Sequence, residues 1–231
     1  MPQGDYKALN LAVIENKVAD FVDVEVFMEE NMAKEILLLM ALEAELGADN
    51  IATIAERCDV CFIGMGKLNA FEATMKALAA GEYRYVINVG TCGSFSHPFG
   101  STLYPSSAWQ GDVYIDPDGL FFTPAEQLNT GMEGCSIVSS DNFIGDDTPL
   151  RQRELLAPYD CMDMEAYAVV RAVRLHSSLH GVDEPTIYLA KIVSDGCDGT
   201  VGDWESRITS LRPTVRAAAE DIIDKIEKLQ P

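Results

Sequence analysis

The feature of this 231-residue chain that most constrains its fold is an alternation of short apolar runs with longer helical patterns. Several runs are apolar at nearly every position, which is typical of strands buried on both faces of a sheet. The predicted strands are Ile36–Ala41, Val60–Gly64, Tyr85–Gly90, Asp112–Ile115, Ser136–Ser139 and Ile187–Val193. Such a sheet needs helices on its faces, so the order of elements predicts an α/β fold.

Three stretches carry helical periodicity: Lys67–Ala80, Met164–Ser177 and Pro213–Leu229. In the last of them Pro213 suits a first helical turn, and apolar residues recur every three or four positions from Val215 onward. The segment 97–129 contains four prolines and several glycines, which favours loops over an edge or mouth of the sheet.

No repeat or low-complexity linker divides the chain, so we expect one domain over residues 34–231. Residues 1–33 form an N-terminal extension of unknown role, for which the sequence allows a helix or an edge strand.

The charge balance excludes several classes of partner. The chain has 37 acidic and 17 basic residues, a formal net charge of −20, so it would repel phosphate backbones and anionic bilayers. No apolar run approaches the ~20 residues that span a bilayer, and the first residues lack the features of a signal peptide. The six cysteines sit mostly within apolar runs, as reduced thiols do. We therefore expect a soluble, cytoplasmic protein whose partner is a small molecule, with neither nucleic acid nor membrane.

Polar residues follow several predicted strands, where α/β sheets bind ligands. Glu45 comes just after the first strand, although it also fits the first turn of a helix. Thr91, Cys92 and Gly93 follow the third strand in a run of small residues that suits a ligand or a plain chain reversal. The glycines of Gly64–Lys67 favour a tight turn over an anion site, because their spacing matches no phosphate-binding motif.

Two acidic clusters complete the candidates. Asp163 and Glu165 flank Met164 at the start of a predicted helix, and Ser194 and Asp195 end a long apolar strand. A carboxyl group there must be hydrogen-bonded or protonated, which makes Asp195 a candidate proton donor. The competing interpretation is that Asp195 caps the following segment. No cysteine or histidine spacing fits a metal site, so we expect no metal.

Six segments occur in the order of one family: MALEAE (40–45), GMGKLNA (64–70), INVGTCGSF (87–95), IVSSDNFI (137–144), DMEAYAV (163–169) and VSDGCDG (193–199). On these motifs the chain resembles the nucleoside phosphorylase superfamily, and within it the 5′-methylthioadenosine/S-adenosylhomocysteine nucleosidases. The resemblance implies a single-domain, three-layer α/β/α fold with a mixed, twisted central sheet and a catalytic domain over residues 34–231. It also implies a homodimer or higher homo-oligomer, and no cofactor.

The resemblance implies roles for the catalytic positions. Glu45 matches the glutamate that activates water, and Asp195, held by Ser194, matches the aspartate that protonates purine N7. Such an acid and base suit the cleavage of a glycosidic bond, which puts positive charge on the sugar and negative charge on the base.

The remaining matches concern substrate binding. Glu165 matches the glutamate that binds the ribose hydroxyls, Met164 would lie under the sugar, and Phe143 would stack on the base. The Ile144 backbone would meet the base edge. Thr91, Cys92 and Gly93 match the loop beside sugar and base. Asp163 stands where many nucleosidases have Glu, which puts one sugar contact in doubt.

The missing arginines favour a hydrolase. Phosphorylases commonly bind phosphate with an arginine at the position of Asn88 and with an earlier one, whereas the first arginine here is Arg57. The expected function is thus hydrolysis of a 5′-modified adenosine (methylthioadenosine, adenosylhomocysteine or 5′-deoxyadenosine) to release adenine. The alternatives are a purine nucleoside phosphorylase that uses Lys67 or Arg84 for phosphate, and a non-catalytic nucleoside-binding protein. The 5′ substituent stays open, because residues 115–136 are short for the family.

Overall fold

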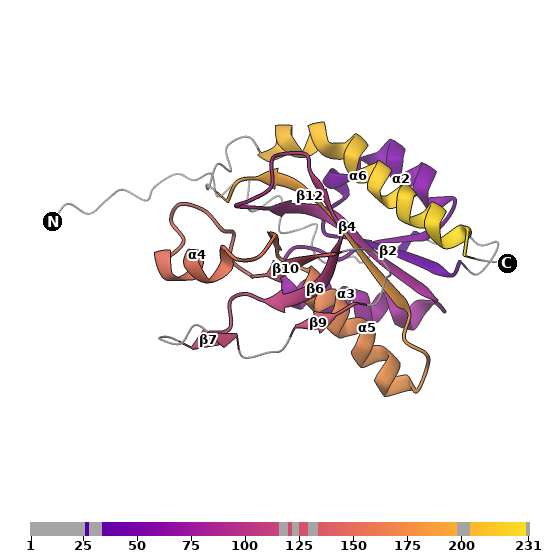
Figure 1. The fold of residues 1–231 in the computed structure, drawn as a ribbon. Helices are drawn as coiled ribbons and strands as arrows, with labels where there is room; N and C mark the ends of the chain where they lie inside the picture. Colours follow the sequence, from indigo (N-terminus) through magenta and orange to yellow (C-terminus); the bar gives the residue numbers. More distant parts are fainter. Residues whose placement is uncertain are drawn as a thin grey trace, which may run out of the picture.

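The computed structural model describes residues 26–27, 34–115, 120–121, 125–128, 134–197 and 204–229. Within them a ten-stranded mixed sheet, visibly twisted, runs through the centre with helices on both faces (Figure 1). Its middle consists of four parallel strands, in the order β3 (Asp59–Phe62), β2 (Ile36–Met40), β4 (Tyr85–Gly93) and β12 (Thr186–Asp195). These strands are almost entirely buried, as their apolar sequences predicted.

The second half of the sheet branches from the carboxyl end of β4. It consists of β11 (Cys161–Asp163), β10 (Cys135–Ser139), β6 (Pro105–Gln110) and β9 (Glu126–Gln127). β11 pairs antiparallel with β4 at Gly93, β10 runs parallel to both β11 and β6, and β9 is antiparallel to β6. The short β5 (Thr102–Leu103) pairs antiparallel with β12. This branching places the ends of β4, β10, β11 and β12 near one another.

Helices cover the two faces of the sheet (Figure 1). One face carries α3 (Lys67–Ala80) and α5 (Ala166–His180), and the other carries α2 (Ala48–Ala55) and α6 (Trp204–Glu227). Successive residues of β2 point to opposite faces of the sheet. Leu37 and Leu39 pack with α3 and α5, whereas Leu38 packs with α2 and α6. A short helix, α4 (Leu150–Leu156), follows β10. The predicted three-layer α/β/α architecture is therefore confirmed.

The last helix differs from its prediction. It begins at Trp204, so Pro213 lies inside α6 and not in its first turn. An internal proline removes one helical hydrogen bond at a cost of about 3 kcal/mol. Leu211 and Val215 on either side are buried against the sheet, and this packing compensates for the loss. The expectation from Pro213 was wrong because it used local propensity alone.

The prediction that residues 97–129 form loops is also wrong in part, because β6 is an internal strand of the main sheet. Its sequence, PSSAWQ, buries only Pro105 and Ala108 and therefore lacks the apolar pattern that marks a strand. The predicted strand at 112–115 shortens to β7 (Tyr114–Ile115), which pairs with β8 (Leu120–Phe121) apart from the main sheet.

Within the N-terminal extension, β1 (Val26–Phe27) pairs antiparallel with β3 at the edge of the sheet, in line with the edge-strand alternative. The other residues of 1–33, and Asp198 and Gly199 of the last motif, lie outside the described residues. None of the helices in the described ranges combines the length and hydropathy of a membrane span. The six cysteines are free thiols.

Candidate active site

A cleft opens at the carboxyl ends of the central strands, the place where open α/β sheets bind ligands. It contains about 700 Å³ of space not filled by protein atoms, and some of this space is open to solvent. The structure brings to its wall every residue that the sequence suggested for catalysis or nucleoside binding: Glu45, Thr91, Cys92, Gly93, Phe143, Ile144, Asp163, Met164, Glu165, Ser194 and Asp195.

Glu45 lies in the 3-10 turn η2 (Glu43–Glu45) after β2, with only 3% of its surface exposed. Its Oε1 accepts hydrogen bonds from the backbone N–H of Thr91 (2.7 Å) and from the Thr91 hydroxyl (2.8 Å). Gly90 makes room for this contact, because a Cβ there would lie 3.1 Å from Glu45 Oε1. Glu43, by contrast, is exposed. Of the two acidic residues in this turn, Glu43 therefore lies on the surface and Glu45 lies buried in the cleft wall.

Asp195 is the last residue of β12 and is half-buried. The Ser194 hydroxyl donates to its Oδ2 (2.9 Å), and the backbone N–H of Cys197 donates to its Oδ1 (2.9 Å). A Cβ on Gly93 would lie 2.9 Å from Asp195 Oδ1, so a glycine is needed beside this carboxyl group. The contact with Cys197 is of the capping kind that the alternative interpretation predicts, and Asp195 makes it while lining the cleft.

Glu165 precedes α5 and is buried. Its Oε1 accepts a hydrogen bond from the Gly66 backbone N–H (2.9 Å). Burial raises the pKa of Glu165 to about 8, and the nearby Asp163 carboxylate adds to this effect. Gly66 has φ 89°, and the next amide, that of Lys67, donates to Asp141. The motif Gly64–Lys67 thus forms a turn whose backbone N–H groups donate hydrogen bonds to the carboxylates of Glu165 and Asp141.

A fully buried ion pair lies behind this wall. Lys191 of β12 places its Nζ 2.9 Å from Asp163 Oδ2. Lys191 was not among the residues predicted from the sequence, although a lysine within an otherwise apolar strand is itself a signal, since a buried ammonium needs a partner. Asp163 was predicted as a substrate contact, and the structure gives this carboxylate three protein donors: Lys191, the Ser139 hydroxyl (2.6 Å) and the Ala166 backbone N–H (2.9 Å).

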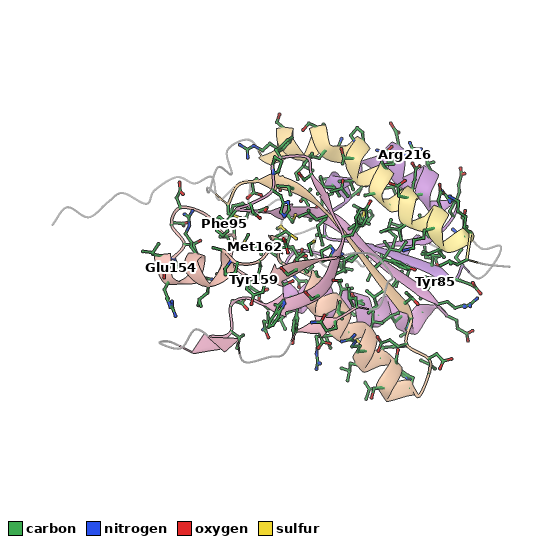
Figure 2. All side chains as sticks on the ribbon, in the orientation of Figure 1. Tyr85, Phe95, Glu154, Tyr159, Met162 and Arg216 are labelled. Carbon is green, nitrogen blue, oxygen red and sulfur yellow. The ribbon has the colours of Figure 1, made fainter. Side chains whose placement is uncertain are left out.

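The rest of the wall is mainly apolar. Phe143 remains 44% exposed, whereas Ile144 is buried in a cluster with Met162 that Phe95 and Tyr159 pack against. Figure 2 shows these last three residues together on the side of the molecule nearest α4. Six lining residues were not predicted from the sequence: Ala41, Leu42, Met65, Asn142, Met162 and Cys197. Most are apolar or small and have no chemical signature in a sequence.

Among the described residues, no lysine, arginine or histidine lines the cleft. Lys67 pairs with Asp112 and Asp141, and Arg84 pairs with Glu35 just before β4, at the opposite end of that strand from the cleft. Arg207 approaches the backbone carbonyl of Ser194, at 3.5 Å. The described residues also contain no cluster of three or more side chains suited to a metal ion.

Comparisons with known proteins identify the fold. No protein-family profile and no curated sequence matches the chain. Among solved structures, it is similar to 5′-methylthioadenosine/S-adenosylhomocysteine nucleosidase from Helicobacter pylori (TM-score 0.66, 16% identity, 86% of this chain and 100% of that chain). It is also similar to futalosine hydrolase from Helicobacter pylori (0.66, 16%, 85% and 99%).

A third similar structure is the 5′-methylthioadenosine/S-adenosylhomocysteine nucleosidase from Neisseria meningitidis (TM-score 0.61, 17% identity, 85% of this chain and 100% of that chain). Each match spans nearly the whole solved chain, so the likeness concerns the complete architecture and not one motif. The chain has the fold of the 5′-methylthioadenosine/S-adenosylhomocysteine nucleosidases, the nucleoside phosphorylase fold that its motifs predicted.

Proposed function

We propose that the protein is a nucleosidase that hydrolyses the N-glycosidic bond of a 5′-modified adenosine and releases adenine. The observation that carries this proposal is one cleft that combines the carboxyl groups of Glu45, Glu165 and Asp195 with no described cationic side chain on its wall. The fold that this chain shares with nucleosidases supports the same chemistry.

In the proposed reaction, Glu45 accepts a proton from a water molecule that attacks the anomeric carbon. Asp195 donates a proton to N7 of the purine, so the base leaves neutral as the glycosidic bond breaks. Glu165 binds the ribose hydroxyls. Positive charge that develops on the sugar is stabilised by the carboxylates around it. Water and nucleoside thus give adenine and the free sugar, with no cofactor.

The charge of the site favours water over phosphate as the nucleophile. A phosphate dianion in this cleft would lie among the carboxyl groups of Glu45, Glu165 and Asp195, with no cationic side chain on the described wall to compensate its charge. The candidates named for phosphate binding, Lys67 and Arg84, are engaged in ion pairs elsewhere. The phosphorylase alternative therefore lacks its charged ligands among the described residues.

The experiment is to incubate the protein without phosphate with 5′-methylthioadenosine, S-adenosylhomocysteine, 5′-deoxyadenosine and futalosine. Release of free base and reducing sugar is the expected result, and the panel identifies the 5′ group. A strict need for phosphate with formation of a sugar 1-phosphate would establish the phosphorylase alternative. Tight adenine binding without turnover of any nucleoside would indicate a binding protein.

We also propose a homodimer or higher homo-oligomer. Met65 and Phe143 line the cleft yet remain 42% and 44% exposed, and a second subunit over the cleft would cover them. A measurement of mass in solution tests this proposal, and a monomer would contradict it.

A further inference from the structure

The ammonium group of Lys191 lies directly behind the cleft wall and takes no role in the reaction described above. Its residue is only 2% exposed, and its partner carboxylate on Asp163 is 1% exposed. Burial acts to lower the pKa of Lys191, but the charges of Asp163 and Glu165 outweigh it and hold the pKa above its ordinary value. The lysine therefore stays charged inside the protein.

Asp163 connects this charge to the start of α5. Its Oδ1 accepts from the Ser139 hydroxyl (2.6 Å), and its Oδ2 accepts from the backbone N–H of Ala166 (2.9 Å), the first residue of α5. The Ser139 hydroxyl oxygen in turn accepts from the backbone N–H of Tyr167 (2.9 Å). The first two amides of α5 are thus bound to a carboxylate and a hydroxyl that belong to neighbouring strands.

Glu165 immediately precedes this fixed turn. Because its own Oε1 is bound to the Gly66 amide, its carboxyl group is held from two sides. The Gly66 amide fixes the side chain, and the Asp163 contacts fix the backbone. A buried carboxylate such as Asp163 keeps its charge only when an opposite charge compensates it, and Lys191 supplies that charge.

We propose that Lys191 is a positioning residue for the sugar site: its ammonium holds the Asp163 carboxylate, which fixes the start of α5 and thereby the carboxyl group of Glu165. This inference rests on the proposed function, in which Glu165 binds the ribose. It assigns Asp163 to the support of the site and not to direct contact with substrate.

The test compares Lys191→Met, which keeps the length of the side chain and removes its charge, with the wild type. We expect the KM for 5′-methylthioadenosine to rise roughly tenfold or more, because the Asp163 contacts no longer fix the backbone at Glu165. Inhibition by free adenine should change less than about twofold, because adenine lacks the sugar. Lys191→Arg, which restores the charge, should recover most of the lost affinity.

A pH profile supplies a second readout. The charged groups that face Glu165 are Asp163, Lys191 and Glu45, and among them Lys191 lowers the pKa of Glu165. Removal of the ammonium should therefore move the Glu165 titration in the profile of kcat/KM to higher pH. A residue that only stabilised the fold would change the melting temperature without moving this profile.

Lys34→Met is the matched control. Lys34 also pairs with a buried carboxylate, that of Asp59 (3.8 Å), but outside the cleft, so its loss should lower the melting temperature and leave KM unchanged. If Lys191→Met does not fold, the double variant Lys191→Met with Asp163→Asn removes the uncompensated carboxylate and should fold. A wild-type KM in either folded variant, or an equal loss of affinity for substrate and adenine, would overturn the proposal.

The two proposals fail in different ways. If the wild type releases no base from any nucleoside, the proposed function is wrong. Equilibrium binding of 5′-methylthioadenosine and of adenine then tests Lys191. A loss confined to the nucleoside supports the positioning role, and an equal loss for both ligands, or none, contradicts it.

Discussion

The two ends of the central sheet differ in how their buried carboxyl groups are compensated by positive charge. At the amino end of β3, Asp59 is compensated by the ammonium of Lys34 (3.8 Å) and by the hydroxyl of Tyr83, which donates to it (2.9 Å). At the carboxyl ends, four acidic side chains line one cleft, and Lys191 lies behind them. Figure 2 labels one residue near each end, Tyr85 at the amino end of β4 and Met162 near the carboxyl end.

We interpret the paired charges at the amino end as stabilising the fold, and the excess of carboxyl groups at the carboxyl end as serving the proposed reaction. At the amino end, the buried carboxylate of Asp59 has the opposite charge of Lys34 beside it. The carboxyl end has more carboxyl groups than cations, and burial raises the pKa of Glu165 to about 8. A protein keeps such an unfavourable excess where the chemistry requires it. The comparison therefore predicts that variants at the carboxyl ends change activity and that variants at the amino end change only stability.

The largest effect is expected from Asp195→Asn. The amide keeps the shape of the carboxyl group and can still accept from Cys197, but it has no acidic proton for the purine. We expect kcat, measured as base release, to fall about 10²- to 10⁴-fold. Adenine binding, measured by calorimetry, should be retained. Near-normal turnover would remove Asp195 from the role of acid.

A smaller effect is expected in the pH dependence of stability. The pKa of Glu165 is raised from 4.5 to about 8 on folding, so its protonated form is favoured in the native state. Its contribution is fully present below pH ~4.5 and is lost as the pH rises to about 8. The unfolding free energy of the wild type, relative to Glu165→Gln, should thus fall by roughly 2–5 kcal/mol over this window.

Urea denaturation at several pH values measures this fall. Glu72→Gln is the control, because Glu72 is exposed and its hydrogen bond with Lys76 lowers its pKa. Its difference from the wild type should stay constant above pH ~5. A constant difference for Glu165→Gln as well would show that Glu165 titrates normally.

The smallest effect on activity is expected at the amino end. Asp59→Asn leaves Lys34 without its charged partner, so we expect a loss of about 1–3 kcal/mol in stability and unchanged kcat and KM. Asp163→Asn, the corresponding change at the other end, should lower both stability and activity. If Asp59→Asn impaired catalysis, the division between the two ends would be wrong.

Much of the site is readable in the sequence because its residues follow strand ends. Glu45, Thr91 and Asp195 each come directly after or at the end of an apolar run, and parallel strands bring such positions to one edge. Helix α3 was predicted at its observed bounds for a similar reason, because its pattern is local. Strands β6 and β11 were not predicted, since one is polar and the other has three residues.

The sequence by itself determined the α/β class, the four central strands, helix α3 and the chemical types gathered at the cleft. These follow from local periodicity and from the identity of residues beside strand ends. Only the tertiary structure decided that Asp163 is bound to Lys191, that Pro213 lies within a helix and that Glu165 is buried enough to titrate near pH 8. Each of these depends on packing and charge interactions with residues that are distant in the sequence. A local sequence pattern carries no information about such contacts.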